Sequence, residues 1–209
     1  MQEPSVEEPP APVAPAVPAD GRAARALRTR EAIVEACIAM VEEGDLRPTA
    51  PRLAERAGVS VRSVFQHFDD LPSLHIAVIE RISERMAALV VPPDTGLPLD
   101  ERIARFVEHR SALLEAATPF RRAAQVHGPF APEIRRAITQ AESYLTAEVA
   151  ATFAPELDAV ADPDERRELL EALAVAAAWS PWDVLRVEHA VPLERARAVM
   201  ARTLRALLS

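Results

Sequence analysis

The chain has 209 residues and a formal net charge of −8, and all 24 of its basic residues are arginine. Its single cysteine excludes an intramolecular disulfide, and a chain of this length buries enough surface to fold without a disulfide or a metal. No stretch approaches the ~20 apolar residues of a membrane-spanning helix, and the N-terminus lacks the basic and apolar regions of a signal peptide. We therefore expect a cytoplasmic protein with no membrane partner.

Proline marks the first boundary along the chain. Six of the first 18 residues are prolines, and each one removes a backbone donor and restricts the residue before it. We therefore expect residues 1–21 to form a disordered or polyproline-like tail, to which no function is assigned.

Apolar residues recur at spacings of three and four from residue 22 onward, and the alternating pattern typical of strands is missing. The sequence therefore predicts an all-α fold. We expect helices, in chain order, at about 22–43, 49–57, 60–67, 71–90, 164–179 and 192–207, with others between residues 97 and 150. Gly44 is expected to end the first helix. Pro119 is expected to interrupt the helix that contains it, and Pro181 to break the penultimate long helix.

The most informative stretch is 49–68, which has the spacing of two short helices joined by a tight turn. Gly58 permits the left-handed backbone that such a turn needs, and Ser60 can cap the second helix. The small Ala54 lies where two crossed helices approach closely, and Ala54, Gly58 and Val64 follow the spacing of a helix-turn-helix. Such a unit presents its second helix to a DNA major groove, although small-residue turns are also common in purely structural helical bundles.

The second helix of this unit has an inward and an outward side. Val64 and Phe68 are expected to point inward, while Thr49 is expected to cap the first helix. The residues left for the outer side are Val61, Arg62, Ser63, Gln66 and His67. A solvated helix face is the alternative interpretation of Arg62 and Gln66.

Residues 28–80 resemble the DNA-binding region of the TetR family. The resemblance rests on Arg30–Ala36 in the first helix, Leu53–Ser60 at the turn, Phe65–Phe68 where the family usually has an aromatic residue, His and Phe, and on Gly44, Thr49 and Leu74. It implies a helix-turn-helix DNA-binding domain over residues 22–72. The rest of the chain, residues 73–209, would be a helical ligand-binding and dimerisation domain.

The resemblance also implies roles for individual residues. Thr49 and Ser60 would hold phosphates through their hydroxyls and helix N-termini. Arg62 would donate to guanine, Gln66 would bind adenine, and Val61 would touch a thymine methyl. The full set of implied DNA-binding residues is Arg28, Thr49, Ser60, Val61, Arg62, Ser63, Gln66 and His67.

The chain departs from the family at two positions. Phe65 stands where Tyr is common, which removes a hydroxyl–phosphate bond, and Leu71 stands where Lys is usual. Asp69 and Asp70 add negative charge nearby. One hypothesis is that residues 22–30, with four arginines and no acid, offset these losses by gripping phosphate or an adjacent minor groove.

The larger domain offers candidate residues for two further sites. For an effector pocket, which would favour a hydrophobic or aromatic molecule, they are Phe106, Leu113, Phe120, Gln125, His127, Phe130, Tyr144 and Trp179. For a dimer interface on the last two long helices, they are Leu173, Val175, Ala178, Trp182, Val199, Met200 and Leu204. Packing within one chain is the alternative interpretation of every residue in both sets.

Catalytic motifs are missing from the sequence. The five histidines lack metal-ligand spacing, no Gly-rich phosphate loop is present, and no nucleophile elbow occurs. We therefore expect no enzymatic activity, no metal and no cofactor. We predict a homodimeric regulator, expected to be a repressor, which binds a palindromic duplex operator and is released by a small-molecule effector. The alternative is a helical protein whose helix-turn-helix is a packing motif or binds another protein.

Overall fold

The computed structural model describes residues 19–209, with side chains described for 21–129 and 131–209, and every regular element in this range is helical. The predicted all-α class is confirmed. The expected tail lies outside the described residues as far as residue 18, and residues 19–21 already belong to the first helix. Within the described range, no helix combines the length and apolar character needed to cross a membrane.

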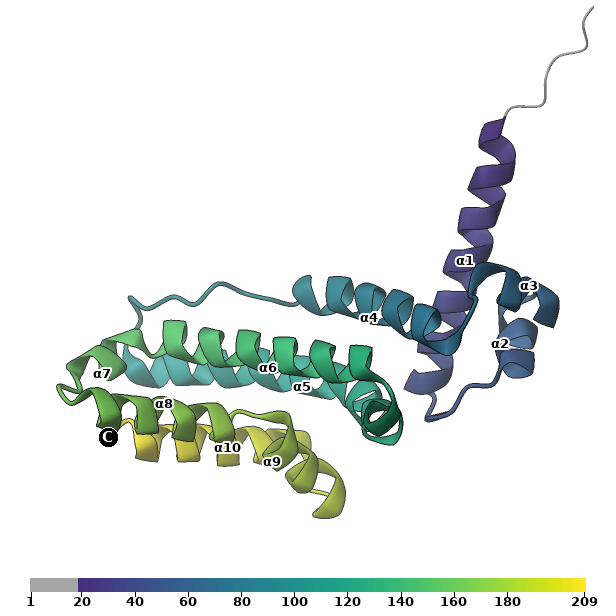
Figure 1. The fold of residues 1–209 in the computed structure, drawn as a ribbon. Helices are drawn as coiled ribbons and strands as arrows, with labels where there is room; N and C mark the ends of the chain where they lie inside the picture. The colour runs from purple at the N-terminus through teal and green to yellow at the C-terminus, as the bar shows by residue number, and fades with distance from the viewer. Residues whose placement is uncertain (1–18) are drawn as a thin grey trace, which may run out of the picture.

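The N-terminal helices pack around a small core. They are α1 (Ala19–Glu42), α2 (Ala50–Ala57), α3 (Val61–His67) and α4 (Leu71–Ala87). α2 and α3 lie across the C-terminal half of α1, and α4 leads away from them toward the rest of the molecule (Figure 1). The core is formed by Ile33, Val34, Ala36, Cys37, Ile38, Met40, Leu53, Ala54, Val64, Phe68, Leu74 and Ala77.

Local signals in the sequence set the ends of these helices. Gly44 has a φ of 94° and ends α1 as predicted, while the next amide, that of Asp45, donates to the Met40 carbonyl at 2.9 Å. Asp70 begins α4 with a capping box, in which its carboxylate accepts from the Ser73 amide at 2.9 Å. The carboxylate therefore stabilises a helix N-terminus as well as adding negative charge near α3.

The larger body consists of two layers of helices. α5 (Leu99–His127) and α6 (Pro132–Thr152) form one layer, and α8 (Pro163–Ala176) and α10 (Leu193–Leu207) form the other (Figure 1). Shorter elements connect them: the 3₁₀ turn η1 (Gly128–Phe130), α7 (Ala154–Ala159), α9 (Trp179–Asp183) and the π-helical turn η2 (Val184–Glu188). Side chains from all four long helices meet in a single apolar core.

Two expectations about proline were wrong. α5 continues through Pro119 to His127, because the loss of one backbone bond is outweighed by packing of the same helix on both sides of the proline. The penultimate long helix ends at Ala176, before Pro181 is reached. Pro181 lies instead in the first turn of α9, where amides have no partner within the helix and a missing donor costs little.

Contacts between the N-terminal helices and the larger body involve two histidines. His75 of α4 bonds through Nδ1 to a carboxylate oxygen of Glu133 at the start of α6, at 3.0 Å. His127, at the end of α5, donates from Nε2 to the Leu46 carbonyl in the α1–α2 loop at 2.8 Å. The two imidazole rings are 5.6 Å apart. These two contacts therefore fix the orientation of the N-terminal helices, α1 to α4, relative to the ends of α5 and α6.

Candidate nucleic-acid interface

The turn between α2 and α3 has the geometry that its sequence predicts. Gly58 adopts a left-handed conformation with φ 66°, and the Val59 amide donates to the Ala54 carbonyl at 2.9 Å. Ser60 is the N-cap of α3, and its hydroxyl oxygen accepts from the Ser63 amide at 3.1 Å. Val64, one turn into α3, is buried. The turn therefore holds α3 at a fixed angle to α2, with one side of α3 committed to the core.

The other side of α3 is open. Arg62 and Gln66 are exposed, Val61 is also exposed, and Ser63 and His67 are half-buried. Among the described side chains, neither Arg62 nor Gln66 has a hydrogen-bonding partner or an ion-pair partner in the chain. The structure therefore brings these outward-facing side chains together on one short helix, where they can meet a flat or convex partner.

Thr49 differs from its prediction. It occupies the N-cap position of α2, with extended φ and ψ of −101° and 153°, but its side chain makes no capping bond. Only its backbone carbonyl joins the helix, by accepting from the Leu53 amide at 2.9 Å. The exposed Thr49 hydroxyl thus remains available to an outside partner.

Sequence reasoning missed one exposed side chain of this surface. Phe65 is 59% exposed on α3. Two other apolar side chains nearby in the sequence are also exposed: Val61, at the start of α3, and Leu71, at the start of α4. In the sequence, Phe65 stands out only because it lacks the hydroxyl of Tyr. The signal that could have identified it is its i,i+4 spacing from Val61 on the same helix.

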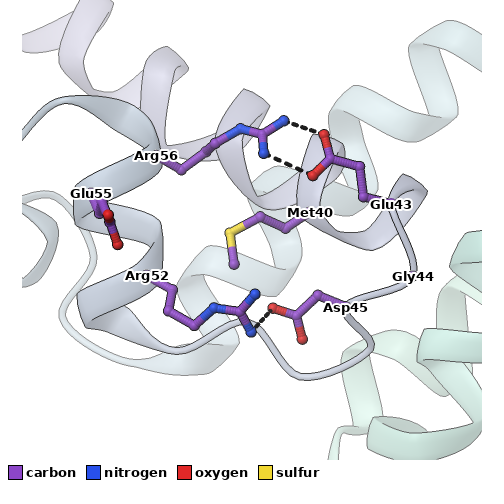
Figure 2. A pocket seen from close by; sticks show the side chains of 7 residues that line it. All are labelled: Met40, Glu43, Gly44, Asp45, Arg52, Glu55 and Arg56. Atoms are coloured by element: carbon purple, nitrogen blue, oxygen red, sulfur yellow. Dashed lines mark hydrogen bonds and ion pairs between the residues drawn. The ribbon is translucent and has the colours of Figure 1, made fainter.

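The arginines of α2 are occupied within the fold. A hollow of about 740 Å³ separates the end of α1 from α2, and Figure 2 shows the two ion pairs that cross it. Arg56 holds Glu43 through both carboxylate oxygens, and Arg52 reaches Asp45 at 2.5 Å. The Arg56 guanidinium lowers the pKa of the Glu43 carboxyl, chiefly by hydrogen bonding. These contacts fasten α2 to the segment that directly follows α1. Both arginines that line the hollow are therefore neutralised within the fold, while Glu55 adds a further negative charge to its lining.

The predicted effector residues differ widely in exposure. Phe106, Leu113 and Trp179 are buried, Phe120 and His127 are half-buried, and Gln125 and Tyr144 are exposed; the side chain of Phe130 lies outside the described residues. Phe106 packs edge-on against Phe153, with ring centroids 5.3 Å apart, and Trp179 donates to the Thr118 hydroxyl at 3.1 Å. A hollow of about 490 Å³ on this body lies instead between α6 and α8, lined by residues such as Thr139, Thr146 and Leu170.

A buried polar cluster between α5 and α6 was also missed. Arg110 is only 1% exposed and donates to the Glu148 carboxylate at 3.0 Å, to the Leu145 carbonyl at 2.9 Å and to the Ala177 carbonyl at 3.0 Å. Burial lowers the pKa of the Arg110 guanidinium. The sequence does contain a signal for this burial: Arg110 follows Val107 by three residues and Phe106 by four, which places it on the apolar side of α5.

Four of the predicted dimer-interface residues are placed elsewhere. Leu173, Trp182, Met200 and Leu204 are at most 4% exposed and pack in the core of the single chain, so little of their surface is left for a second chain. Three others reach the surface: Val175 is 63% exposed, Val199 is 39% exposed, and Ala178 is half-buried. Apolar spacing alone identifies the side of a helix that avoids water, but it does not show whether that side is covered by the same chain or by a second chain.

The N-terminal helix-turn-helix, joined through α4 to a larger all-helical body, is a fold that this chain shares with solved structures of transcriptional regulators, one of them of the TetR family. Neither a protein-family model nor a curated protein matches the sequence. Solved structures that share the fold include the three described below. Separately, no group of three or more His, Cys, Asp or Glu side chains in the described range is placed to hold a metal ion.

Two of these structures come from Rhodococcus. One is a TetR-family transcriptional regulator with a TM-score of 0.65 and 16% identity, covering 87% of this chain and 99% of that chain. The other, a transcriptional regulator from Rhodococcus sp. Rha1, has a TM-score of 0.63 and 16% identity, covering 88% and 95%. The third is the multidrug binding protein EbrR complexed with imidazole, with a TM-score of 0.53 and 19% identity, covering 86% and 94%. The resemblance expected from residues 28–80 is therefore confirmed as a likeness of fold.

Proposed function

We propose that this chain is a TetR-family transcriptional regulator, and that α3 reads duplex DNA from the major groove. The observation that carries the proposal is the division of α3 into two sides. Val64 is held in the core, while Arg62 and Gln66 project outward without partners among the described side chains. Side chains of these two types, free on the outer side of a recognition helix, can hydrogen-bond to base edges in a major groove. A solvated helix face is the alternative that the experiment below distinguishes.

Individual roles follow from the chemistry of the base edges. Arg62 donates to guanine O6 and N7, Gln66 pairs with adenine N6 and N7, and Val61 contacts a thymine methyl group. Ser63 completes the base-facing side. The hydroxyls of Thr49 and Ser60, together with His67 and Arg28, bind the phosphate backbone and fix the register.

The regulator acts as a homodimer with two recognition helices about 34 Å apart, which matches successive major grooves of a palindromic operator. The surface proposed for dimerisation includes Val175 and Ala178 near the end of α8 and Val199 on α10. These three residues are what remains of the predicted interface once the core residues are removed. α8 and α10 pack on each other, so one partner surface can cover both helices.

A small, mostly apolar effector is proposed to bind within the larger body and to favour a conformer whose recognition helices no longer fit successive grooves. The ligand shifts that equilibrium only by its differential affinity for the two conformers. Support comes from the contacts of His75 and His127, which join α5 and α6 to the small domain. Release of DNA on effector binding would make the protein a repressor.

Selection of duplexes from a random pool by the full-length chain tests the proposal. We expect enrichment of a two-fold symmetric sequence whose half-sites are separated by about one helical turn. Enrichment of no sequence would favour the alternative, in which the helix-turn-helix is a packing motif. Enrichment of a single asymmetric half-site would retain DNA reading and reject the dimeric arrangement.

A further inference from the structure

The N-terminal part of α1 leaves the body of the protein. α1 starts at Ala19, but its first buried side chain among those described is Ile33. The intervening 14 residues extend about 21 Å at 1.5 Å per residue. Figure 1 shows this part of α1 extending past α2 and α3 on its own. None of the described side chains in this segment is fully buried, so packing stabilises it little. Isolated helices of this length are only marginally stable in water.

This projecting part carries a stripe of arginines. Arg22, Arg25 and Arg28 are all exposed, and at 3.6 residues per turn their spacing of three places them within an arc of about 120°. Leu27, which is also exposed, falls on the opposite side of the helix. The first acid that follows is Glu31, so residues 22–30 have a net charge of +4.

The stripe differs from the two arginines of α2 in having no partners. Among the described side chains, Arg22, Arg25 and Arg28 form no ion pair or hydrogen bond, whereas Arg52 and Arg56 of α2 are held by Asp45 and Glu43 (Figure 2). A paired guanidinium must give up its carboxylate before it can bind a phosphate. An unpaired, solvated one needs no such exchange.

The stripe is also close to the proposed reading surface. Arg30, two residues after Arg28, lies over the ring of Phe68 at the end of α3, with its guanidinium carbon 5.0 Å from the ring centroid. The Arg30–Phe68 contact holds the base of the projecting segment against α3. By the same spacing of 3.6 residues per turn, Arg30 lies on a different side of α1 from Arg25 and Arg28. The contact therefore fixes where the segment starts relative to α3 and leaves the stripe itself free.

We infer that the projecting segment of α1 is a second DNA-contacting element, in which Arg22, Arg25 and Arg28 bind backbone phosphates flanking the base pairs that α3 reads. The inference rests on the proposed function, which already places Arg28 at the phosphate backbone, and extends that contact along α1 to Arg25 and Arg22. The occupant is the same duplex, because the charge is complementary to phosphate and the base of the segment is held against α3. Such contacts add affinity for any sequence and carry no base information themselves.

The test compares the full chain with the variant R22Q/R25Q/R28Q, since Gln keeps a high helix propensity while removing the charge. A matched control, R105Q/R136Q/R167Q, removes three exposed arginines from the larger body. Affinity for the selected duplex is measured over a salt series, and again on a duplex trimmed of the base pairs flanking the recognised sequence. A random-sequence duplex serves as a third probe.

We expect R22Q/R25Q/R28Q to bind at least about ten-fold more weakly at physiological salt. Its salt slope should be shallower by about 0.9 for each phosphate that a protomer no longer neutralises. Sequence preference should be unchanged. Trimming the flanks should weaken the wild-type chain and leave the variant unaffected.

Two outcomes would overturn the inference. One is an unchanged salt slope on both the selected and the random duplex. The other is an equal loss in the control variant, which would mean that net charge acts at long range. Failure to select any sequence would reject the reading role of α3 alone, because the random duplex still reports the contribution of the stripe. Absence of binding to every duplex would reject both.

Discussion

Arg110 brings a charge into the core of the larger body and pairs it there through its two terminal nitrogens, while its Nε has no hydrogen-bonding partner. Its guanidinium is 1% exposed and is bonded to Glu148 and to two backbone carbonyls. Removing one partner of such a pair leaves the other charge buried alone, which costs far more than the pair contributes relative to an apolar pair.

We therefore expect Arg110→Ala to lower the free energy of unfolding by about 3–5 kcal/mol, measured by urea denaturation. Arg105→Ala is the control, since Arg105 forms an exposed pair with Glu101 on the same helix, and its loss should cost about 0.5 kcal/mol or less. Equal losses for the two variants would show that burial of Arg110 does not contribute to its cost.

The reactivity of the Cys37 thiol gives a second test of burial at a single residue. Burial, with a smaller contribution from Asp45, raises the pKa of its thiol to about 11. Because the thiolate is the reactive form, we expect the folded protein to react with a disulfide reagent at neutral pH only as fast as it unfolds. Rapid labelling without denaturant, at the rate of a free thiol, would contradict the burial of Cys37.

At the scale of the helices, the N-caps of α2 and α3 allow the effect of a hydroxyl on stability to be measured separately from its effect on DNA binding. Ser60 accepts a capping bond from the Ser63 amide, while Thr49 caps α2 with its backbone only. We expect Ser60→Ala to cost about 1 kcal/mol in the free energy of unfolding, and Thr49→Ala to cost a few tenths at most. Both should weaken DNA binding, since both hydroxyls are proposed phosphate ligands. Equal stability of the two variants would reject the Ser60 cap.

The small domain follows closely from its sequence because its signals are local. Gly44 follows the end of α1 and Gly58 adopts the left-handed turn, as the sequence predicts, and the inward position of Val64 follows from spacing within one short helix. The larger body was less predictable. Pro119 was tolerated because of packing on either side of it, which depends on residues distant in the sequence.

The apolar sides of α8 and α10 posed a related problem. Leu173 and Met200 carry the same spacing signal that a subunit interface would produce, yet both lie in the core of their own chain. Only the arrangement of the other helices decides which side is covered. For the same reason, spacing could not show whether the candidate effector residues gather into one site.

At the scale of the whole molecule, the contacts that join the N-terminal helices to the larger body include a titratable pair, His75 and Glu133. The hydrogen bond from His75 is the main cause that lowers the pKa of Glu133 below its ordinary value of 4.5. A carboxyl whose pKa is lower in the folded state stabilises that state above its unfolded pKa, and the contribution is lost as the pH falls through the folded pKa.

We therefore expect Glu133→Gln to unfold more easily than the wild-type chain near neutral pH. The difference should shrink once the pH falls below about 4.5 and vanish below the lowered pKa. Urea denaturation of both proteins over this pH range provides the measurement. A difference that stays constant down to the lowest pH would show that the carboxylate charge is not involved.

The reading role of α3 is tested most directly by the ratio of affinities for the selected duplex and for a scrambled duplex of the same composition, at one salt concentration. For the wild-type chain we predict a ratio of about 10³ or more. For Arg62→Ala the ratio should fall by about ten-fold or more, with little change in affinity for the scrambled duplex. A wild-type ratio near one, or a ratio that Arg62→Ala leaves unchanged, would contradict the proposal that α3 reads DNA.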